Sequence, residues 1–395
     1  MNQRMYGLGS KRSVIREIFE FGKKRAAEVG AENVYDFSLG NPSVKPPQIM
    51  EDTLISLLKE EDATALHGYT SAQGDAGVRA AIADYIRKTH GVECDADYIY
   101  MTCGAAASLT ITLSALCNEG DEVITFAPYF TEYKVFAETA GARLVALASD
   151  PDTFQIDFSP LESALNEKTA AVLVNSPNNP SGVVYSEATI QKLAALLEQK
   201  SAEYKKTIYL ITDEPYRELV YGGVKVPYLT KYYRNTFVCY SYSKSLSLPG
   251  ERIGYIFVNP SAENAKQLYF AVCGAGRALG YVCAPSLFQK MVARCQGVTS
   301  DVSVYEKNRD LLAGALREYG FSCVHPDGAF YLFVKSPEPD ANAFCERAKK
   351  YDLLLVPGDD FGCAGYVRIA YCVSPDMIRR SLPSFKKLAG EYFGK

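Results

Sequence analysis

Seven short apolar runs rich in β-branched residues lie between residues 98 and 258, and stretches of helical periodicity separate them. The runs occupy residues 98–103, 122–128, 142–148, 170–177, 207–214, 236–243 and 252–258. Because they are apolar at nearly every position, we expect both faces of each strand to be buried. Such strands, alternating with helices, predict a mainly parallel seven-stranded sheet covered by helices.

The first 45 residues predict an amphipathic helix followed by an extended loop. Apolar residues between 14 and 19 share one face of a helix that ends near Gly30, and charged residues occupy the other face. The loop at residues 38–47 contains Asn-Pro and two consecutive prolines, which exclude a helix. Because residues 1–45 are too few to fold alone, we expect them to pack on the small domain or on a partner subunit.

The predicted fold class is α/β, with a large domain at residues 46–285 and a small α+β domain at residues 286–395. Helices predicted at residues 49–59 and 78–88 precede the sheet of the large domain. In the small domain, helical patterns flank a strand-like run that ends at Val334. A chain of 395 residues, of which 48% are hydrophobic, is long enough for two cores.

Charge and composition argue against several classes of function. The formal net charge is −4 and no basic stripe is present, so nucleic acid is not an expected partner. The 11 cysteines form no C-x-x-C pair and the 3 histidines lie far apart, so we expect reduced thiols and no metal site. No run approaches the ~20 apolar residues of a membrane span. We therefore expect a soluble, cytoplasmic protein that does not contact a membrane.

Lys244 follows the predicted strand at residues 236–243, at the end where α/β sheets collect ligands. It lies between serines and an apolar Leu-Pro-Gly turn. A lysine is most often a solvated surface charge, but desolvation inside a protein pushes the side chain toward its neutral form. A neutral amine can attack an aldehyde and hold it as an imine, so Lys244 is a candidate for covalent catalysis.

Asp213 ends another predicted strand, and Tyr216 follows it closely. Asp213 could simply cap a helix, because Pro215 suits a first helical turn. It could instead hold a protonated pyridine nitrogen and keep that ring an electron sink. Tyr216, and Asn179 from the NNPSG loop, could then bind a ring oxygen, although NNPSG alone is equally typical of a turn.

An anionic group on such a ring compound would need hydrogen-bond donors. The strand-to-helix turn after residues 98–103 consists of small residues, and free N–H groups at a helix N-terminus bind phosphate. Small residues are also typical of a plain tight turn. Nearby hydroxyls and a guanidinium would add donors, and an aromatic side chain could stack on the ring. These candidates are Gly104, Ala105, Ala106, Ser241, Ser243, Arg252 and, for stacking, Phe130.

Taken in order, these motifs resemble the class I and II aminotransferases of the fold-type-I pyridoxal-phosphate-dependent enzymes. The matching pieces run from about residue 38 to 371 and include SLGNP, GYTSAQG, CGAAAS, NSPNNPSG, DEPY, SYSKSLSLPGERIGY, DGAFY and YVRIAY. The most specific combination is DEPY followed by S-x-S-K and G-x-R-x-G. The resemblance implies a fold-type-I transferase with pyridoxal 5'-phosphate as cofactor and a homodimer as the assembly.

The resemblance also implies a role for each cofactor-binding residue. Lys244 bonds the cofactor and shuttles a proton, and Asp213 holds the pyridine nitrogen. Asn179 and Tyr216 bind the ring oxygen, and Tyr69 reaches the phosphate in the neighbouring subunit. The implied reaction is the ping-pong transfer of an amino group from an L-amino acid to a 2-oxo acid.

Arg368 is implied to bind the α-carboxylate of the substrate, with Gly40 and Asn179 lining the same pocket. The sequence does not decide which side chain the amino acid substrate carries. Aspartate or glutamate needs a second cation, and the helix after Ala105, where some aspartate enzymes of this family carry a lysine, has only apolar and hydroxyl residues at 108–114. The remaining candidate cations are Arg12, Arg16 and Arg277. An aromatic or other apolar amino acid fits equally well, and we expect glutamate and 2-oxoglutarate as one pair.

Two other functions stay open from the sequence. A C–S β-lyase of the same fold would use the same cofactor and release pyruvate and ammonia from cystine without any 2-oxo acid. A cofactor-binding regulatory module without turnover would carry an added DNA-binding domain, and the ~30 residues before SLGNP are too few for one.

Overall fold

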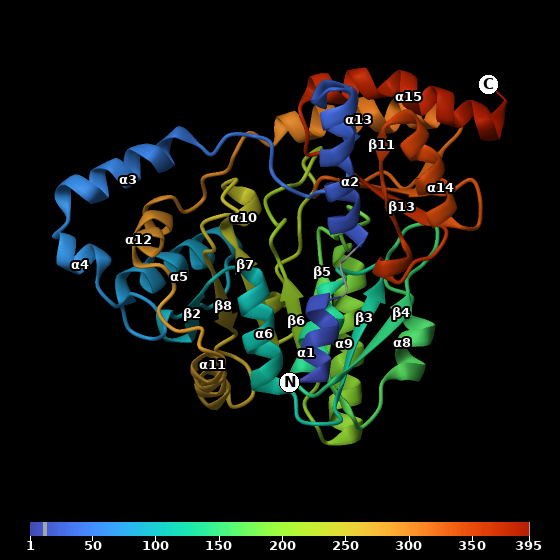
Figure 1. The fold of residues 1–395 in the computed structure, drawn as a ribbon. Helices are drawn as coiled ribbons and strands as arrows, with labels where there is room; N and C mark the ends of the chain where they lie inside the picture. The colour runs from blue at the N-terminus through green and yellow to red at the C-terminus, as the bar shows by residue number, and fades with distance from the viewer. Residues whose placement is uncertain (11–13, 395) are drawn as a thin grey trace.

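Seven strands form one sheet in the computed structural model, which describes residues 1–10 and 14–394 (Figure 1). Their order across the sheet is β2 (Ile99–Thr102), β8 (Gly254–Val258), β7 (Thr236–Ser241), β6 (Tyr209–Asp213), β5 (Thr169–Asn175), β3 (Glu122–Ala127) and β4 (Arg143–Ala148). Strand β8 runs antiparallel to both neighbours, and the other pairs are parallel. Each strand overlaps one of the predicted apolar runs, so the predicted sheet is confirmed.

Apolar side chains alternate between the two faces of this sheet, and helices cover both faces. In β5, Leu173 packs in a cluster with α6 (Ala105–Leu116) and α11 (Ala265–Leu279), whereas Val172 and Val174 pack in a cluster with α9 (Glu187–Tyr204). A strand buried on both faces must be apolar at every position, which explains the continuous runs. The other helices of this part are α3 (Gln48–Glu60), α4 (Ala63–His67), α5 (Ala76–His90), α7 (Glu132–Thr139), α8 (Phe158–Ala164) and α10 (Tyr242–Ser245).

A second, antiparallel sheet lies toward the C-terminus, with the order β12 (Val356–Pro357), β13 (Tyr366–Ala370), β10 (Tyr331–Lys335) and β9 (Ser322–Cys323). Its core also contains residues of α13 (Ser303–Glu318), α14 (Ala341–Ala348) and α15 (Pro375–Phe393), drawn in orange and red in Figure 1. Helix α12 (Ser286–Arg294) packs instead on α3 and α5. The domain boundary at residue 285 therefore stays a prediction, and the packing of α12 favours a boundary after Arg294.

The N-terminal segment packs on the part of the chain that carries the smaller sheet. Helix α2 (Val14–Val29) places Ile18 in a cluster with Leu354 and Phe361. Strand β1 (Tyr35–Asp36) pairs in parallel with β11 (Leu353–Leu354). Helix α1 (Gln3–Ser10) was not predicted and buries none of its residues. Of the helices described, none combines the length and apolarity that crossing a membrane requires.

Candidate active site

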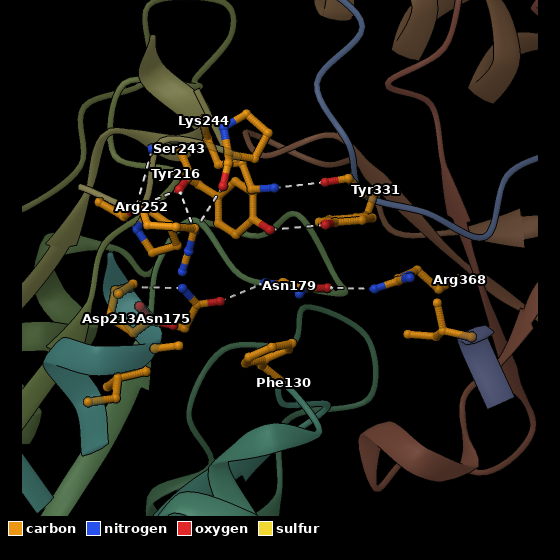
Figure 2. Close-up of a pocket in the computed structure, with 18 residues that line it drawn as sticks. Phe130, Asn175, Asn179, Asp213, Tyr216, Ser243, Lys244, Arg252, Tyr331 and Arg368 are labelled. Atoms are coloured by element: carbon orange, nitrogen blue, oxygen red, sulfur yellow. Dashed lines mark hydrogen bonds between the residues drawn. The ribbon is translucent and has the colours of Figure 1, made fainter. Parts of the chain in front are cut away.

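A cavity of about 300 Å³ opens at the carboxyl ends of the parallel strands (Figure 2). Asn175 and Asp213 end β5 and β6, Ser241 ends β7, and Lys244 lies in the short helix that follows. This is the edge of an α/β sheet where loops and helix N-termini converge. The cavity is lined by these predicted residues: Gly40, Ala105, Ala106, Phe130, Asn179, Asp213, Tyr216, Ser241, Ser243, Lys244, Arg252 and Arg368.

Lys244 is held by the chain segment that precedes it and by the loop at Gly40. The Ser241 side chain accepts a hydrogen bond from the Ser243 N–H at the start of α10, which fixes the turn. The Lys244 Nζ donates to the Gly40 carbonyl oxygen at 2.7 Å. Burial, the largest influence, lowers the Lys244 pKa from 10.5 to about 8. An appreciable fraction of this amine is therefore uncharged and nucleophilic near neutral pH.

Asp213 lines the cavity, and one of its two carboxylate oxygens has no hydrogen-bond partner among the described residues. Its Oδ2 accepts a hydrogen bond from the Tyr133 hydroxyl at 2.5 Å, while its Oδ1 is buried and has no hydrogen-bond partner in the described chain. Burial raises the pKa of this carboxyl to about 7. The chain after it forms a turn at residues 215–218 rather than a helix, so helix capping does not explain Asp213. An unpaired buried carboxylate oxygen is costly unless a ligand donor pairs with it.

The start of α6 forms a cradle suited to an anion. Gly104 lies at φ 86° before the helix, and no side chain in the described part of the protein caps the helix N-terminus. A Cβ at Gly104 would lie 2.8 Å from an Arg252 guanidinium nitrogen, so only glycine leaves this gap. Arg252 donates to the Ser243 hydroxyl at 3.4 Å, and the Ser241 and Ser243 hydroxyls lie 2.8 Å apart. A helix N-terminus, two hydroxyls and a guanidinium thus converge at one end of the cavity.

Arg368 supplies a cation at another part of the cavity wall. Its Nη1 donates to the Asn179 Oδ1 at 3.2 Å (Figure 2), and its Nη2 donates to the Ser38 carbonyl at 2.6 Å. Its Nε is buried and has no hydrogen-bond partner among the residues described. The guanidinium lies 4.7 Å from the ring centroid of Tyr331 and 4.9 Å from that of Phe361. A planar cation fixed in this way is suited to a carboxylate.

Two tyrosines at the site were missed by the sequence analysis. Tyr133 binds Asp213, as described above, and the Tyr331 hydroxyl lies 2.9 Å from the Tyr216 hydroxyl (Figure 2). A Cβ at Gly40 would come within 1.9 Å of the Tyr331 hydroxyl oxygen, so this glycine makes room for the ring. The DGAFY motif contains Tyr331, but nothing in the motif shows which residue its hydroxyl meets.

Four predicted residues lie away from the cavity or outside the described chain. The Tyr69 side chain is 98% exposed and does not line the cavity of its own chain. Arg277 is exposed on α11, and Arg16 lies on α2; neither lines the cavity. Arg12 lies outside the described residues. The cations that line the cavity, as far as the chain is described, are Lys244, Arg252 and Arg368.

Comparisons with known proteins agree with this geometry. An aminotransferase from Eubacterium rectale has a solved structure that is 61% identical, with a TM-score of 0.98 over 100% of this chain and 99% of that one. The aspartate aminotransferase of Thermotoga maritima is 27% identical, with a TM-score of 0.85 over 96% and 98% of the two chains. The aromatic-amino-acid aminotransferase 2 of Thermococcus litoralis is 26% identical over 96% of each chain. The family described as aminotransferase class I and II matches residues 31–385, so this chain belongs to that family and is an aminotransferase.

Proposed function

We propose that the cavity binds pyridoxal 5'-phosphate and that the enzyme uses it to move an amino group from an L-amino acid to a 2-oxo acid. The supporting observation is that one cavity contains three matched features. These are an amine of lowered pKa, a buried carboxylate oxygen without a partner, and a helix N-terminus beside hydroxyls and a guanidinium. They suit the aldehyde, the pyridinium nitrogen and the phosphate of this cofactor.

The residues present fit this cofactor at each of its polar groups. When bound, it supplies an electron sink that stabilises negative charge at the substrate Cα. We assign Lys244 to the aldehyde carbon and Asp213 to the ring nitrogen. The ring oxygen would be bound by Asn179 and Tyr216, the ring face by Phe130, and the phosphate by Gly104, Ala105, Ala106, Ser241, Ser243 and Arg252.

The protein's own residues then bind the substrate and move its proton. Arg368 binds the α-carboxylate through its free Nε and the adjoining guanidinium edge, and Asn179 and Gly40 line the same pocket. Once its amine is free, Lys244 acts as general base for the Cα proton and returns it later in the reaction. Its hydrogen bond to the Gly40 carbonyl gives the amine a fixed direction. Tyr331 restrains the Tyr216 hydroxyl beside it.

The substrate is proposed from the relatives, because the described cavity does not select one. Curated relatives include a probable aspartate/prephenate aminotransferase of Aquifex aeolicus, 27% identical over 93% of this chain and 94% of its own length. We propose aspartate or an aromatic amino acid, with glutamate and 2-oxoglutarate as one pair. The test incubates the purified protein with each L-amino acid and 2-oxoglutarate and measures glutamate and the new 2-oxo acid. Equal amounts of both are expected; pyruvate and ammonia from cystine without 2-oxoglutarate would instead indicate a β-lyase.

We further propose a cytoplasmic homodimer in which Tyr69 reaches the phosphate of the partner's site. Tyr69 is almost fully exposed, and α3 exposes Ile49, Ile55 and Leu58 nearby in the sequence. Apolar side chains exposed together commonly mark an interface between subunits. Sedimentation of the purified protein should give twice the mass of the 43.4 kDa chain.

Removing the Tyr133 hydroxyl should lower the catalytic rate while the cofactor stays bound. The Tyr133 hydroxyl donates a hydrogen bond to the Asp213 Oδ2, and this bond stabilises the charged form of the carboxyl. Tyr133→Phe removes that bond. A hydrogen bond to a charged group contributes about 1.5–3 kcal/mol, so kcat/KM should fall roughly 10- to 100-fold. Tyr129→Phe is the matched control, because Tyr129 stacks on Tyr133 but does not line the cavity. Equal activities of the two variants would contradict the role given to Tyr133.

The lowered pKa of Lys244 predicts how cofactor uptake depends on pH. A lysine pKa that is lowered to about 8 leaves roughly a tenth of the amine uncharged at pH 7 and most of it uncharged at pH 9. The rate at which the cofactor-free protein takes up pyridoxal phosphate should therefore rise about tenfold between pH 7 and 9 and then level off. A free lysine derivative, measured in parallel, should keep rising. A protein curve that rises without a plateau would show that the amine is not perturbed.

A further inference from the structure

A second cavity, of about 590 Å³, lies beside the turn at residues 215–218, which follows Asp213. Pro215 and Tyr216 line the active-site cavity, whereas Arg217 and Glu218 line the second one. Of the residues that the structure describes, none lines both cavities. Consecutive residues of one turn therefore line two different cavities.

Two residues that line the second cavity share an unusual feature with two residues of the active site. In the active site, the unpartnered buried atoms are the Asp213 Oδ1 and the Arg368 Nε, where we place the cofactor and the substrate. In the second cavity, the Glu218 Oε2 and the Tyr228 hydroxyl are likewise buried, and neither has a hydrogen-bond partner in the described parts of the chain. Buried polar atoms without partners are few in folded proteins, and two of them on residues that line one cavity are consistent with a ligand or a water bound there.

The charge of Arg217 and a hydrogen bond from Tyr240 both favour the charged form of the Glu218 carboxyl, but neither outweighs its burial. Arg217 is bound to Glu214 through two of its nitrogens and to the carbonyls of Val226 and Pro227. Glu218 itself forms no ion pair with any described residue, and burial raises its pKa to about 7. A bound ammonium group would favour the charged form of this carboxyl and donate to its free oxygen.

The rest of the cavity offers an aromatic wall and two free cations. The His90 and Tyr228 rings stack at 4.1 Å with an angle of 6° between them. Burial lowers the His90 pKa to about 3, so this imidazole is neutral. Lys225 and Lys231 are exposed at the cavity and make no ion pair within the described ranges. A carboxylate acceptor, a flat apolar surface and two lysines together suit a zwitterion that carries an aromatic or apolar side chain.

We propose that this second cavity binds a free amino acid with an aromatic or apolar side chain. The ammonium group pairs with Glu218 and meets the Tyr228 hydroxyl, and the carboxylate faces Lys225 and Lys231. The site is separate from the catalytic one and is lined by Arg217 and Glu218 of the turn that also contains Tyr216, so its ligand would contact a turn that lines the active site.

The probe is α-methyl-L-phenylalanine, which has no Cα hydrogen and therefore cannot be transaminated. Calorimetric titration of the holoenzyme should show two molecules bound per chain. Glu218→Gln should weaken the second site about 10- to 100-fold, because the amide lacks the charge. The joint substitution of Lys225→Gln and Lys231→Gln, both at exposed positions, should weaken it by at least about tenfold and cannot disturb the core. The absorbance change of the bound cofactor, which reports only the catalytic site, should be the same in all three proteins.

Three results would overturn the proposal. One is a single molecule bound per wild-type chain. Another is a second site that both sets of substitutions leave unchanged. The third concerns a crystal structure of the protein with the probe. Glu218 also lines a separate, enclosed cavity of about 10 Å³, and a water molecule bound to Glu218 there, with no probe in the second cavity, would contradict the proposal.

Discussion

Replacing Lys244 by alanine should reduce kcat by at least about 10⁴-fold while the protein still folds. The substitution removes the amine that is assigned both to the cofactor and to the Cα proton, and a positioned general base alone contributes up to about 10⁴-fold. The side chain is half-buried, and among the described residues it donates a hydrogen bond to the Gly40 carbonyl alone, so its loss disturbs little packing. Single-turnover kinetics with an amino acid and saturating cofactor measure this effect.

Lys192→Ala is a suitable control for this experiment, because Lys192 is exposed on α9 and lies over the Phe158 ring, away from the active-site cavity. Its kcat should equal that of the wild type. A primary amine added to Lys244→Ala should restore part of the rate, since it can accept the proton in place of the side chain. Turnover of Lys244→Ala within tenfold of the wild type would remove Lys244 from the mechanism.

Replacing Arg368 by leucine should lower kcat/KM for amino acids by about 30- to 5,000-fold. Removing one partner of a buried, hydrogen-bonded charge pair costs about 2–5 kcal/mol, which corresponds to that range. Arg368 is 3% exposed, and leucine leaves the substrate carboxylate without its partner. The loss should appear mainly as a raised KM if the contact is equally strong in the ground state and the transition state.

Two comparisons separate carboxylate binding from a general loss of structure. Arg368→Lys keeps the charge but not the planar fork, so its kcat/KM should lie between those of leucine and wild type. An amine substrate without a carboxylate should react equally with wild type and Arg368→Leu. If the leucine variant lost activity on both kinds of substrate to the same degree, Arg368 would be structural and not a carboxylate-binding residue.

The central sheet was predictable because each of its buried strands is a run of consecutive apolar residues. Val172, Leu173 and Val174 point alternately to two helical layers, and a strand with two buried faces must be apolar throughout. The order of the strands was not predicted, since it depends on crossover connections that leave no local pattern. Helix α12 was placed with the C-terminal domain, yet its apolar face packs on α3 and α5. Amphipathic spacing shows that a helix has a buried face, but not which core buries it.

The polar residues of the site were predictable where they lie at or just after the carboxyl end of a strand. Asp213, Ser241 and Lys244 follow apolar runs, so their common location came from the rule for parallel sheets. Arg368 carried no such local signal and was proposed through the family resemblance. Tyr133 meets Asp213 from 80 residues away and Tyr331 meets Tyr216 from 115 residues away. Side-chain pairs at that separation depend on the packed structure and have no signature in either segment.

The most direct test is to find where the cofactor is attached. The purified protein is treated with borohydride to fix any bound pyridoxal phosphate, digested, and examined by mass spectrometry. We expect one modified peptide per chain, with the added mass on Lys244. A colourless protein with no modified peptide, or a modification on a different lysine, would contradict the assignment of this cavity and of Lys244.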